Sequence, residues 1–278
     1  MRIPPWLRVK IPCNHNYTAT GDLIGDLNLN TVCQSAKCPN KFECFSSGTA
    51  TFLIMGSTCT RNCAFCNIGN DPVPPLDPTE PARVAEGARR LGLKHVVITS
   101  VTRDDLLDGG GAHFAATIRA VRGVLPECSI EVLIPDFQGS LPALNMVMQA
   151  APDIINHNVE TPPVHYPRIR PQADYAQSLQ LLERVKQAGH RSKSGLMVGL
   201  GETDEEVRGV IDDLAAIHCD IVTIGQYMRP SRKHPAVERY VHPDVFEEYA
   251  AYGREKGIRH MFCAPLVRSS YNAAMFTE

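Results

Sequence analysis

The chain has 278 residues, of which 44% are hydrophobic and 21% charged, a balance typical of a globular protein and unlike that of a disordered or fibrous one. Its 28 basic and 30 acidic residues give a formal net charge of −2, which argues against a strongly basic nucleic-acid binder. No apolar stretch approaches the roughly 18 residues of a membrane-spanning helix, and the N-terminus MRIPPWLRVKIP lacks the apolar core of a secretory signal. We therefore expect a soluble, cytoplasmic protein of one or two domains.

Short β-rich runs alternate with helical stretches from about residue 49 onward. Most of these runs are continuously apolar, as expected for strands buried on both faces of a parallel sheet. The expected strands are 50–55, 95–99, 130–134, 154–158, 195–198 and 221–224, with a weaker seventh at 260–264. The expected helices are 79–91, 111–123, 140–150, 175–188, 204–217 and 243–256.

Six β-then-α units in succession predict parallel strands joined by right-handed crossovers, closing wholly or partly into a barrel. A doubly wound open sheet is the alternative, because the order of the elements alone does not exclude it. We expect one compact domain with three parts. These are an irregular, cysteine-bearing extension over residues 1–48, a partial (β/α)6 TIM-type barrel over 49–260, and a short C-terminal segment over 261–278.

The ten cysteines are unevenly placed, and seven of them fall within the first 66 residues. Disulfide-dense scaffolds are usually small, so in a chain of this length such crowding indicates metal ligation in a reducing compartment. Six of the seven form two groups of three. The other four cysteines have no regular spacing and are expected to be small buried hydrophobic residues; they are Cys13, Cys128, Cys219 and Cys263.

One group, Cys59-x3-Cys63-x2-Cys66, follows the first expected strand directly. This places it at the carboxyl ends of the strands, where barrel enzymes hold their active sites. Three thiolates in one loop can hold three irons of a cubane and leave the fourth iron open to a substrate or cofactor. A zinc site or incidental buried cysteines are the alternatives. Zinc motifs, however, typically pair two separated Cys-x2-Cys units, so the spacing favours an iron–sulfur cluster.

With Phe65 directly before Cys66, this motif resembles that of the radical S-adenosylmethionine (SAM) superfamily. The resemblance implies a partial barrel and a [4Fe–4S] cluster whose unique iron binds the amino and carboxylate groups of SAM. Reductive cleavage of SAM then gives a 5′-deoxyadenosyl radical. In such an enzyme the cofactor supplies the difficult chemistry and the protein supplies the positioning.

The upstream group, Cys33-x4-Cys38-x5-Cys44, lacks a fourth cysteine or histidine at the close spacing of a zinc knuckle, although His15 is a conceivable partner. Together with the other triad and the C-terminal VRSSYNA, it makes the chain resemble the lipoyl synthase family. The resemblance covers nearly the whole chain. It includes TSVTRDDLLDGG (99–110), EVLIPDF (131–137), NHNVET (156–161), RIRPQADYAQSL (168–179), KSGLMVGLGET (193–203), IGQYMRPSRKHPAV (224–237) and PLVRSSYNA (265–273).

The resemblance implies that Cys33, Cys38 and Cys44 hold an auxiliary [4Fe–4S] cluster, and that Ser270 of the RSSY sequence completes it. An oxygen ligand is harder and more readily protonated than a thiolate, so it is able to dissociate when cluster sulfide attacks a substrate radical. The alternative for Ser270 is an ordinary loop hydroxyl bonded to backbone.

The resemblance also implies contacts with SAM from residues at the ends of the expected strands. Asn158 is expected to bind ribose hydroxyls and Arg170 the methionine carboxylate, and Gly199, Gly201 and Glu202 are expected to back the adenosyl group. The alternative is a network of structural turns. The complete set of expected cofactor-binding residues is Phe65, Ser100, Arg103, Asn158, Glu160, Arg170, Gly199, Gly201 and Glu202.

A polar cluster follows the sixth expected strand and is interpreted as a substrate or carrier contact, with a solvated basic loop as the alternative. It comprises Gln226, Tyr227, Arg229, Ser231, Arg232, Lys233 and His234.

The implied activity is the insertion of two sulfur atoms at C6 and C8 of an octanoyl chain carried on a lysine, with sulfur donated by the auxiliary cluster. The implied partners are octanoylated lipoyl carrier domains (2-oxoacid dehydrogenase E2 subunits and the glycine cleavage H protein), an electron donor such as ferredoxin or flavodoxin, and iron–sulfur carrier proteins. Neither nucleic acid nor a membrane is expected.

Two alternatives come from other classes. A radical sulfur-inserting enzyme acting on dethiobiotin would lack the upstream triad and RSSY. A non-catalytic electron carrier would hold each cluster with four protein ligands and need no barrel.

Overall fold

A single eight-stranded sheet organises the chain in the computed structural model, which describes residues 2–9, 15–271 and 273–276. The strands neighbour one another in sequence order from β1 to β8. A short β1 (Asn30–Thr31) pairs antiparallel with β2, and every later pair is parallel. The parallel strands are β2 (Thr51–Ile54), β3 (His95–Ser100), β4 (Ser129–Leu133), β5 (Ile154–Asn156), β6 (Arg191–Val198), β7 (Ile221–Gln226) and β8 (His260–Cys263).

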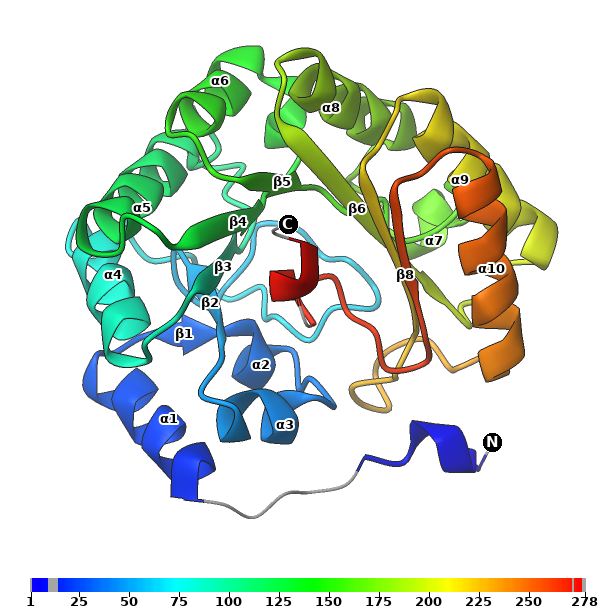
Figure 1. Ribbon diagram of the computed structural model, residues 1–278, viewed down its shortest axis with the longest axis horizontal. Coiled ribbons are helices and arrows are strands. Elements are labelled where there is room, and N and C mark those ends of the chain that lie inside the picture. The colour runs from blue at the N-terminus through cyan, green and yellow to red at the C-terminus, as the bar shows by residue number, and fades with distance from the viewer. Residues whose placement is uncertain (1, 10–14, 272, 277–278) are drawn as a thin grey trace.

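Helices follow the strands in turn and lie outside the ring that the strands form (Figure 1). They are α4 (Glu80–Arg90), α5 (Gly111–Val124), α6 (Leu141–Gln149), α7 (Tyr166–Ile169), α8 (Tyr175–Gln187), α9 (Asp204–Ala216) and α10 (Pro243–Glu255). The expected partial barrel of six β/α units is confirmed, and most elements end within two residues of their expected limits. The doubly wound alternative is wrong, because such a sheet reverses its strand order at a switch point and this one does not.

The expectation of an irregular N-terminal extension is wrong in detail, because much of the described extension is helical. It contains η1 (Pro5–Leu7), α1 (His15–Asp26), α2 (Val32–Ser35) and α3 (Lys41–Ser46). Residues such as Asn, Gly and Cys weaken the local helical signal, and burial of Ile24 and Phe45 against the barrel compensates for it. The expected boundary at residue 260 also falls inside β8, which pairs with β7 through residue 263.

Successive strand residues point alternately towards the helices and towards the barrel interior. Val96 and Ile98 of β3 face outward and pack in the apolar core beneath the helices, so His95 and Val97 face inward. The interior is partly polar, and Glu131 and Lys193 form a fully buried ion pair there, with Nζ 2.9 Å from both carboxylate oxygens. This interior is the space in which a site can form.

The C-terminal segment returns into the ring of strands after β8, and Figure 1 shows η4 (Ala273–Phe276) in the middle of that view. It packs against β3 and against β7. Gly225 of β7 makes the second contact possible, because a Cβ at that position would lie 2.0 Å from the carbonyl oxygen of Val267. Ser270, Tyr271 and Ala273 of this segment therefore line a cavity together with strand residues.

Candidate active site with two cysteine triads

The loop that carries Cys59, Cys63 and Cys66 follows β2 and is fixed to loops that follow other strands. Backbone N–H of Ala64 donates to the carbonyl of Ile169 at 2.9 Å, and Nε2 of His234 lies 3.0 Å from the carbonyl oxygen of Cys66. Phe65 packs in an apolar cluster with Ile169, Leu200 and Tyr227. The loop is thus held at the carboxyl ends of the strands by contacts far apart in sequence.

Arg61, inside this loop, makes the most extensive of these contacts. Its guanidinium donates to Asp104 at 2.6 and 3.0 Å and to Asp136 at 2.7 Å twice, so that both carboxylates are bound in the bidentate manner. Burial alone would raise the pKa of Asp136, but Arg61 holds this pKa below its ordinary value. Arg61 therefore attaches the cysteine loop to the ends of β3 and β4.

Burial raises the pKa of the Cys66 thiol to about 12, and the neighbouring Cys63 and Cys59 add to this effect. Burial also raises the pKa of Cys63, although the nearby Arg170 opposes the rise. The backbone N–H of Cys66 donates to the carbonyl of Cys63 at 3.0 Å, so these two residues lie in one turn of the loop. Because iron binds the thiolate, loading this site must displace protons.

Four of the expected SAM contacts carry a buried polar atom with no hydrogen-bond partner in the described part of the chain. These atoms are Oγ of Ser100, Nη1 of Arg103, Oδ1 of Asn158 and Nε of Arg170. Buried polar atoms are nearly always paired in native proteins, so four such atoms near the triad indicate a polar ligand. The residues present therefore fit a cofactor with several donors and acceptors, as SAM has.

Glu160 and Arg170 form the charged part of this site. Arg170 donates to Tyr166 Oη at 2.9 Å and to the carbonyl of Asn158 at 3.0 Å, and the Asn158 amide donates to Glu160 at 3.0 Å. Burial raises the pKa of Glu160, and Arg170 and Asn158 only partly offset it. Glu160 also adopts a φ of 66°, a conformation that non-glycine residues hold mainly where the surroundings enforce it.

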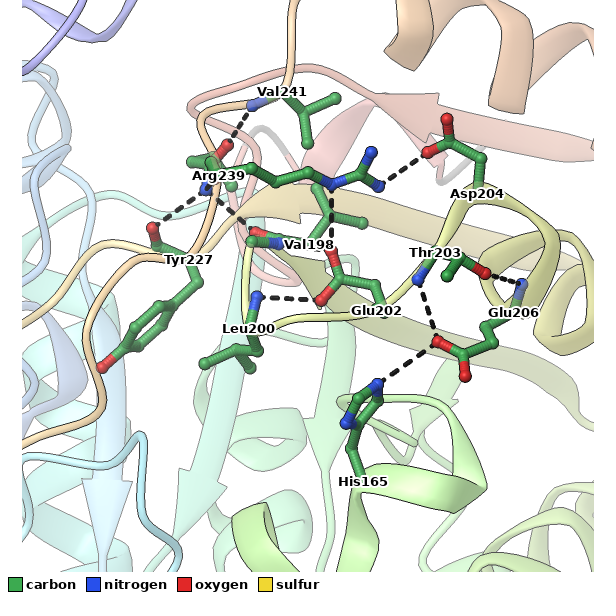
Figure 2. Close-up of polar contacts among 12 residues, drawn as sticks. His165, Val198, Leu200, Glu202, Thr203, Asp204, Glu206, Tyr227, Arg239 and Val241 are labelled. Atoms are coloured by element: carbon green, nitrogen blue, oxygen red, sulfur yellow. Dashed lines mark hydrogen bonds and ion pairs between the residues drawn. The ribbon is translucent and has the colours of Figure 1, made fainter. Parts of the chain in front are cut away.

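The glycine-rich loop after β6 is shaped from within by Glu202 (Figure 2). The Glu202 carboxylate accepts from the backbone N–H of Gly199 and, at 2.8 Å, of Leu200, and Nε of Arg239 lies 3.7 Å away. Gly199 has a φ of 103°, and a Cβ there would lie 2.1 Å from Nε2 of Gln226. Glu202 therefore has a structural part in this loop.

The same loop leads into α9 through a capping box, also visible in Figure 2. Thr203 and Glu206 exchange side-chain-to-backbone hydrogen bonds at 3.2 and 2.9 Å, which satisfies the exposed amides at the start of the helix. Gly201 has a φ of 109° and completes the turn. Contact of Gly199, Gly201 or Glu202 with an adenosyl group stays a prediction.

The polar cluster after β7 divides into buried and exposed parts. Gln226 and Tyr227 are buried, and the Gln226 amide donates to the carbonyl of Val198 at 3.0 Å. Arg229 donates to two carbonyls of its own loop. Arg229, Arg232 and Lys233 are all exposed. Because the Arg229 guanidinium is engaged within the loop, Arg232 and Lys233 are the more available to a partner.

The upstream triad belongs to the N-terminal extension, and two of its members, Cys33 and Cys44, line a second cavity. Cys33 lies in α2, Cys44 in α3 and Cys38 in the turn between them. Burial raises the pKa of Cys33 to about 11 and that of Cys44 to about 12, and the charges of the other two cysteines add to the rise at Cys44. Among the described residues, no three His, Cys, Asp or Glu side chains are grouped closely enough to hold a single metal ion.

Ser270 lies in the same cavity as Cys33 and Cys44, although 226 residues separate it from Cys44 in the sequence. The cavity has a volume of about 170 Å³. Tyr271 Oη donates to Glu43 at 2.8 Å, and the Asn40 amide donates to the carbonyl of Leu266 at 2.7 Å. The terminal segment is thus bonded directly to the cysteine-bearing segment. Cys33, Cys44 and Ser270 line one cavity and Cys38 lies in the turn between α2 and α3, so the thiols and the hydroxyl present suit an iron–sulfur cluster.

Ser269 connects the two sites, because its hydroxyl accepts from the Asn158 amide at 3.2 Å. No sequence motif predicts this contact, and none predicts the parts played by Arg61, Asp136 and His95. Two of these have a local signal: Arg61 lies between two cysteines of a motif, and Asp136 lies two residues after a predicted strand. The pairing of Ser269 with Asn158 has none.

The remaining described cysteines lie in apolar surroundings. Cys128 and Cys219 are buried in the core, and Cys263 packs against it. Burial raises the pKa of Cys219 to about 12. Cys13 lies outside the described residues. Within the described part of the chain, no helix is both long and apolar enough to span a bilayer.

Comparisons with known proteins agree with this geometry. Residues 53–214 match the family model of the radical SAM superfamily, and residues 1–38 match that of the N-terminal domain of lipoyl synthase. The chain is 75% identical over its whole length to a lipoyl synthase of Oleidesulfovibrio alaskensis, covering 96% of that protein. It is 71% identical over 273 residues to a lipoyl synthase of Nitratidesulfovibrio vulgaris, covering 92% of it.

Solved structures share the fold at low identity. Streptococcus suis SuiB superimposes with a TM-score of 0.61 at 10% identity over 81% of this chain, which spans 52% of SuiB. Methylornithine synthase (PylB) superimposes with a TM-score of 0.54 at 13% identity, over 90% of this chain and 84% of that one. These likenesses concern the fold alone, whereas the full-length identity and the two family models establish that the chain belongs to the lipoyl synthase family of the radical SAM superfamily.

Proposed function

We propose that this chain inserts two sulfur atoms at C6 and C8 of a protein-bound octanoyl-lysine, giving the lipoyl group. One observation carries the proposal beyond family membership. Cys33 and Cys44 of the second triad share one cavity with the terminal Ser270, and the neighbouring Ser269 bonds to a candidate SAM contact. Two sites joined through a single segment suit a reaction that needs a radical at one and sulfur at the other.

Cys59, Cys63 and Cys66 are assigned to the cluster that binds SAM. When bound, the cluster and SAM supply an electron and a carbon-centred radical, which an unactivated C–H bond requires because it offers no acid–base handle. Arg61 fixes the loop in place, and the buried polar atoms of Ser100, Asn158 and Arg170 are available to orient the cofactor. The low exposure of these groups excludes water from a reactive intermediate.

Cys33, Cys38, Cys44 and Ser270 are assigned to an auxiliary [4Fe–4S] cluster that donates the sulfur. The hydroxyl ligand belongs to a segment outside the regular strands, in which Tyr271 stacks on Phe262 with centroids 6.5 Å apart. A ligand on such a segment is released more easily than one within the sheet. This property suits a cluster that must give up part of itself in the reaction.

The proposed protein substrates are octanoylated E2 subunits and the glycine cleavage H protein. Ferredoxin or flavodoxin is the proposed electron donor, and iron–sulfur carrier proteins are the proposed source of new clusters. The exposed Arg232 and Lys233 lie in the loop that contacts the carbonyl of Cys66 through His234. They are the proposed contacts for an acidic carrier surface near the radical site.

Separate replacement of the two triads tests the assignment. The anaerobically reconstituted chain should hold about eight irons, four per triad. Alanine at Cys33, Cys38 and Cys44 should halve the iron, spare SAM cleavage and prevent sulfur insertion into an octanoylated carrier peptide, measured by mass spectrometry. Alanine at Cys59, Cys63 and Cys66 should halve the iron and abolish cleavage. Lipoyl product from the first variant would contradict the auxiliary cluster as sulfur source.

A further inference from the structure

A histidine outside both cysteine motifs lines the cavity of the upstream triad. His95 begins β3 and shares its inner face with Val97, since alternate strand residues point the same way. Val97 pairs with Thr51 of β2, and both residues line the same cavity as Cys33. The imidazole therefore reaches the same cavity as Cys33, Cys44 and Ser270.

The imidazole is buried without a hydrogen bond. Its side chain is 6% exposed, and neither Nδ1 nor Nε2 has a hydrogen-bond partner within residues 2–9, 15–271 and 273–276. Leaving a buried polar group unpaired costs about 1–3 kcal/mol. An unpaired ring nitrogen at a cavity therefore indicates a ligand that is not part of the chain.

Glu131 lies behind the ring. Its Oε2 is 3.7 Å from Nε2 of His95, and both of its oxygens accept from Lys193. Burial alone would raise the pKa of Glu131, but Lys193 and His95 outweigh burial and lower it. An ionised carboxylate beside Nε2 favours the tautomer with its proton there and leaves a lone pair on Nδ1. A carboxylate behind one nitrogen is the usual setting of a histidine that binds metal through the other.

Other polar side chains around the cavity are already engaged. Glu43 and Tyr271 bond to each other, and Thr49 Oγ1 donates to the carbonyl of Cys44 at 3.0 Å. Of the lining side chains outside the triad, His95 is thus the one that combines a buried, unpaired donor atom with a supporting carboxylate.

From this geometry we propose that Nδ1 of His95 is an alternative iron ligand of the auxiliary site and competes with Ser270 for the iron that the three cysteines leave open. The proposal rests on the proposed function, because it requires a cluster on the upstream triad. Imidazole is a suitable ligand for iron. The exchange would break the Fe–O bond and form an Fe–N bond without a change in the oxidation state of iron. The serine oxygen would take a proton from water, and the buffer would neutralise the hydroxide that is left. The iron would then stay bound after the serine leaves.

The test uses the full chain with Cys59, Cys63 and Cys66 replaced by alanine, so that only the upstream site carries a cluster. The protein is labelled with ¹⁵N-histidine, reconstituted anaerobically, reduced and examined by pulsed EPR. We expect Ser270→Ala to show a directly coordinated ¹⁵N coupling. Adding His95→Asn should abolish it, whereas adding His218→Asn, at an exposed histidine, should leave it unchanged.

Iron analysis distinguishes failure of the His95 assignment from failure of the auxiliary-cluster assignment. Four irons without histidine coupling in Ser270→Ala would overturn the assignment of His95 and leave the proposed function intact. Loss of iron on Ser270→Ala alone would also overturn it, because the imidazole would then be unable to replace the serine. A triple-alanine parent that binds no iron while Ser270 is present would overturn the auxiliary cluster itself.

Discussion

Arg61 provides the sharpest test of how the cysteine loop is held. Arg61→Met keeps the apolar stem of the side chain and removes the guanidinium, so Asp136 and Asp104 lose four hydrogen bonds together. The Asp136 side chain is 0% exposed and the Asp104 side chain 23% exposed. Water is therefore able to replace Arg61 at Asp104 but not at Asp136.

The size of the effect follows from that difference in burial. Removing one partner of a buried pair leaves an uncompensated charge, which costs about 3–5 kcal/mol. We expect Arg61→Met to lower the free energy of unfolding by this amount, with nearly all of the loss arising at Asp136. Adding Asp136→Asn removes the stranded charge, so the double variant should be more stable than the sum of the single effects, by about 1–3 kcal/mol.

Urea unfolding of the iron-free protein measures this directly, provided that the dependence of the unfolding free energy on urea is unchanged. The matched control is Arg89→Met, at a side chain on the exposed face of α4 that pairs with Glu86, and no shift in its midpoint is expected. A loss below about 1 kcal/mol for Arg61→Met, or strict additivity with Asp136→Asn, would refute the reasoning.

Gly225→Ala places a Cβ 2.0 Å from the carbonyl oxygen of Val267, so it should displace the terminal segment. Sulfur insertion should then be abolished while SAM cleavage persists. The control Gly123→Ala, in open space on α5, should leave both reactions unchanged. Burial lowers the pKa of His157 from 6.5 to about 4. Between these pH values the unfolded chain binds a proton that the folded protein does not, so the free energy of unfolding is highest above pH 6.5 and falls as the pH drops towards 4. This loss is about 2 kcal/mol between pH 7.5 and 5, and unfolding experiments on His157→Gln should show a correspondingly weaker acid dependence. Ser269→Ala removes the bond between the terminal segment and the cofactor site, and binding assays should show SAM affinity reduced about 5-fold, as for the loss of one hydrogen bond.

The local pattern of the sequence determined the barrel. Strands are predicted from continuous apolar runs such as 95–99, and the helices between them from the regular spacing of apolar residues. Both signals come from residues that are close in the sequence. The motif Cys59-x3-Cys63-x2-Cys66 is also local, because one loop supplies all three sulfurs, and the family resemblance added the upstream triad and Ser270. The helices of the extension escaped prediction because burial of Ile24 and Phe45, and not local propensity, stabilises them.

Only the tertiary structure decided what lies beside these motifs. Asp136 meets Arg61, and Ser269 meets Asn158, across 75 and 111 residues, and no periodicity encodes such separations. The inward direction of His95 depends on which face of β3 packs against the helices. The carboxylate beside its ring comes from Glu131 on the neighbouring strand β4. A strand pattern predicts that successive side chains point to opposite faces of the sheet. Which residues those side chains contact is decided only when the sheet curves and the C-terminal segment packs inside it.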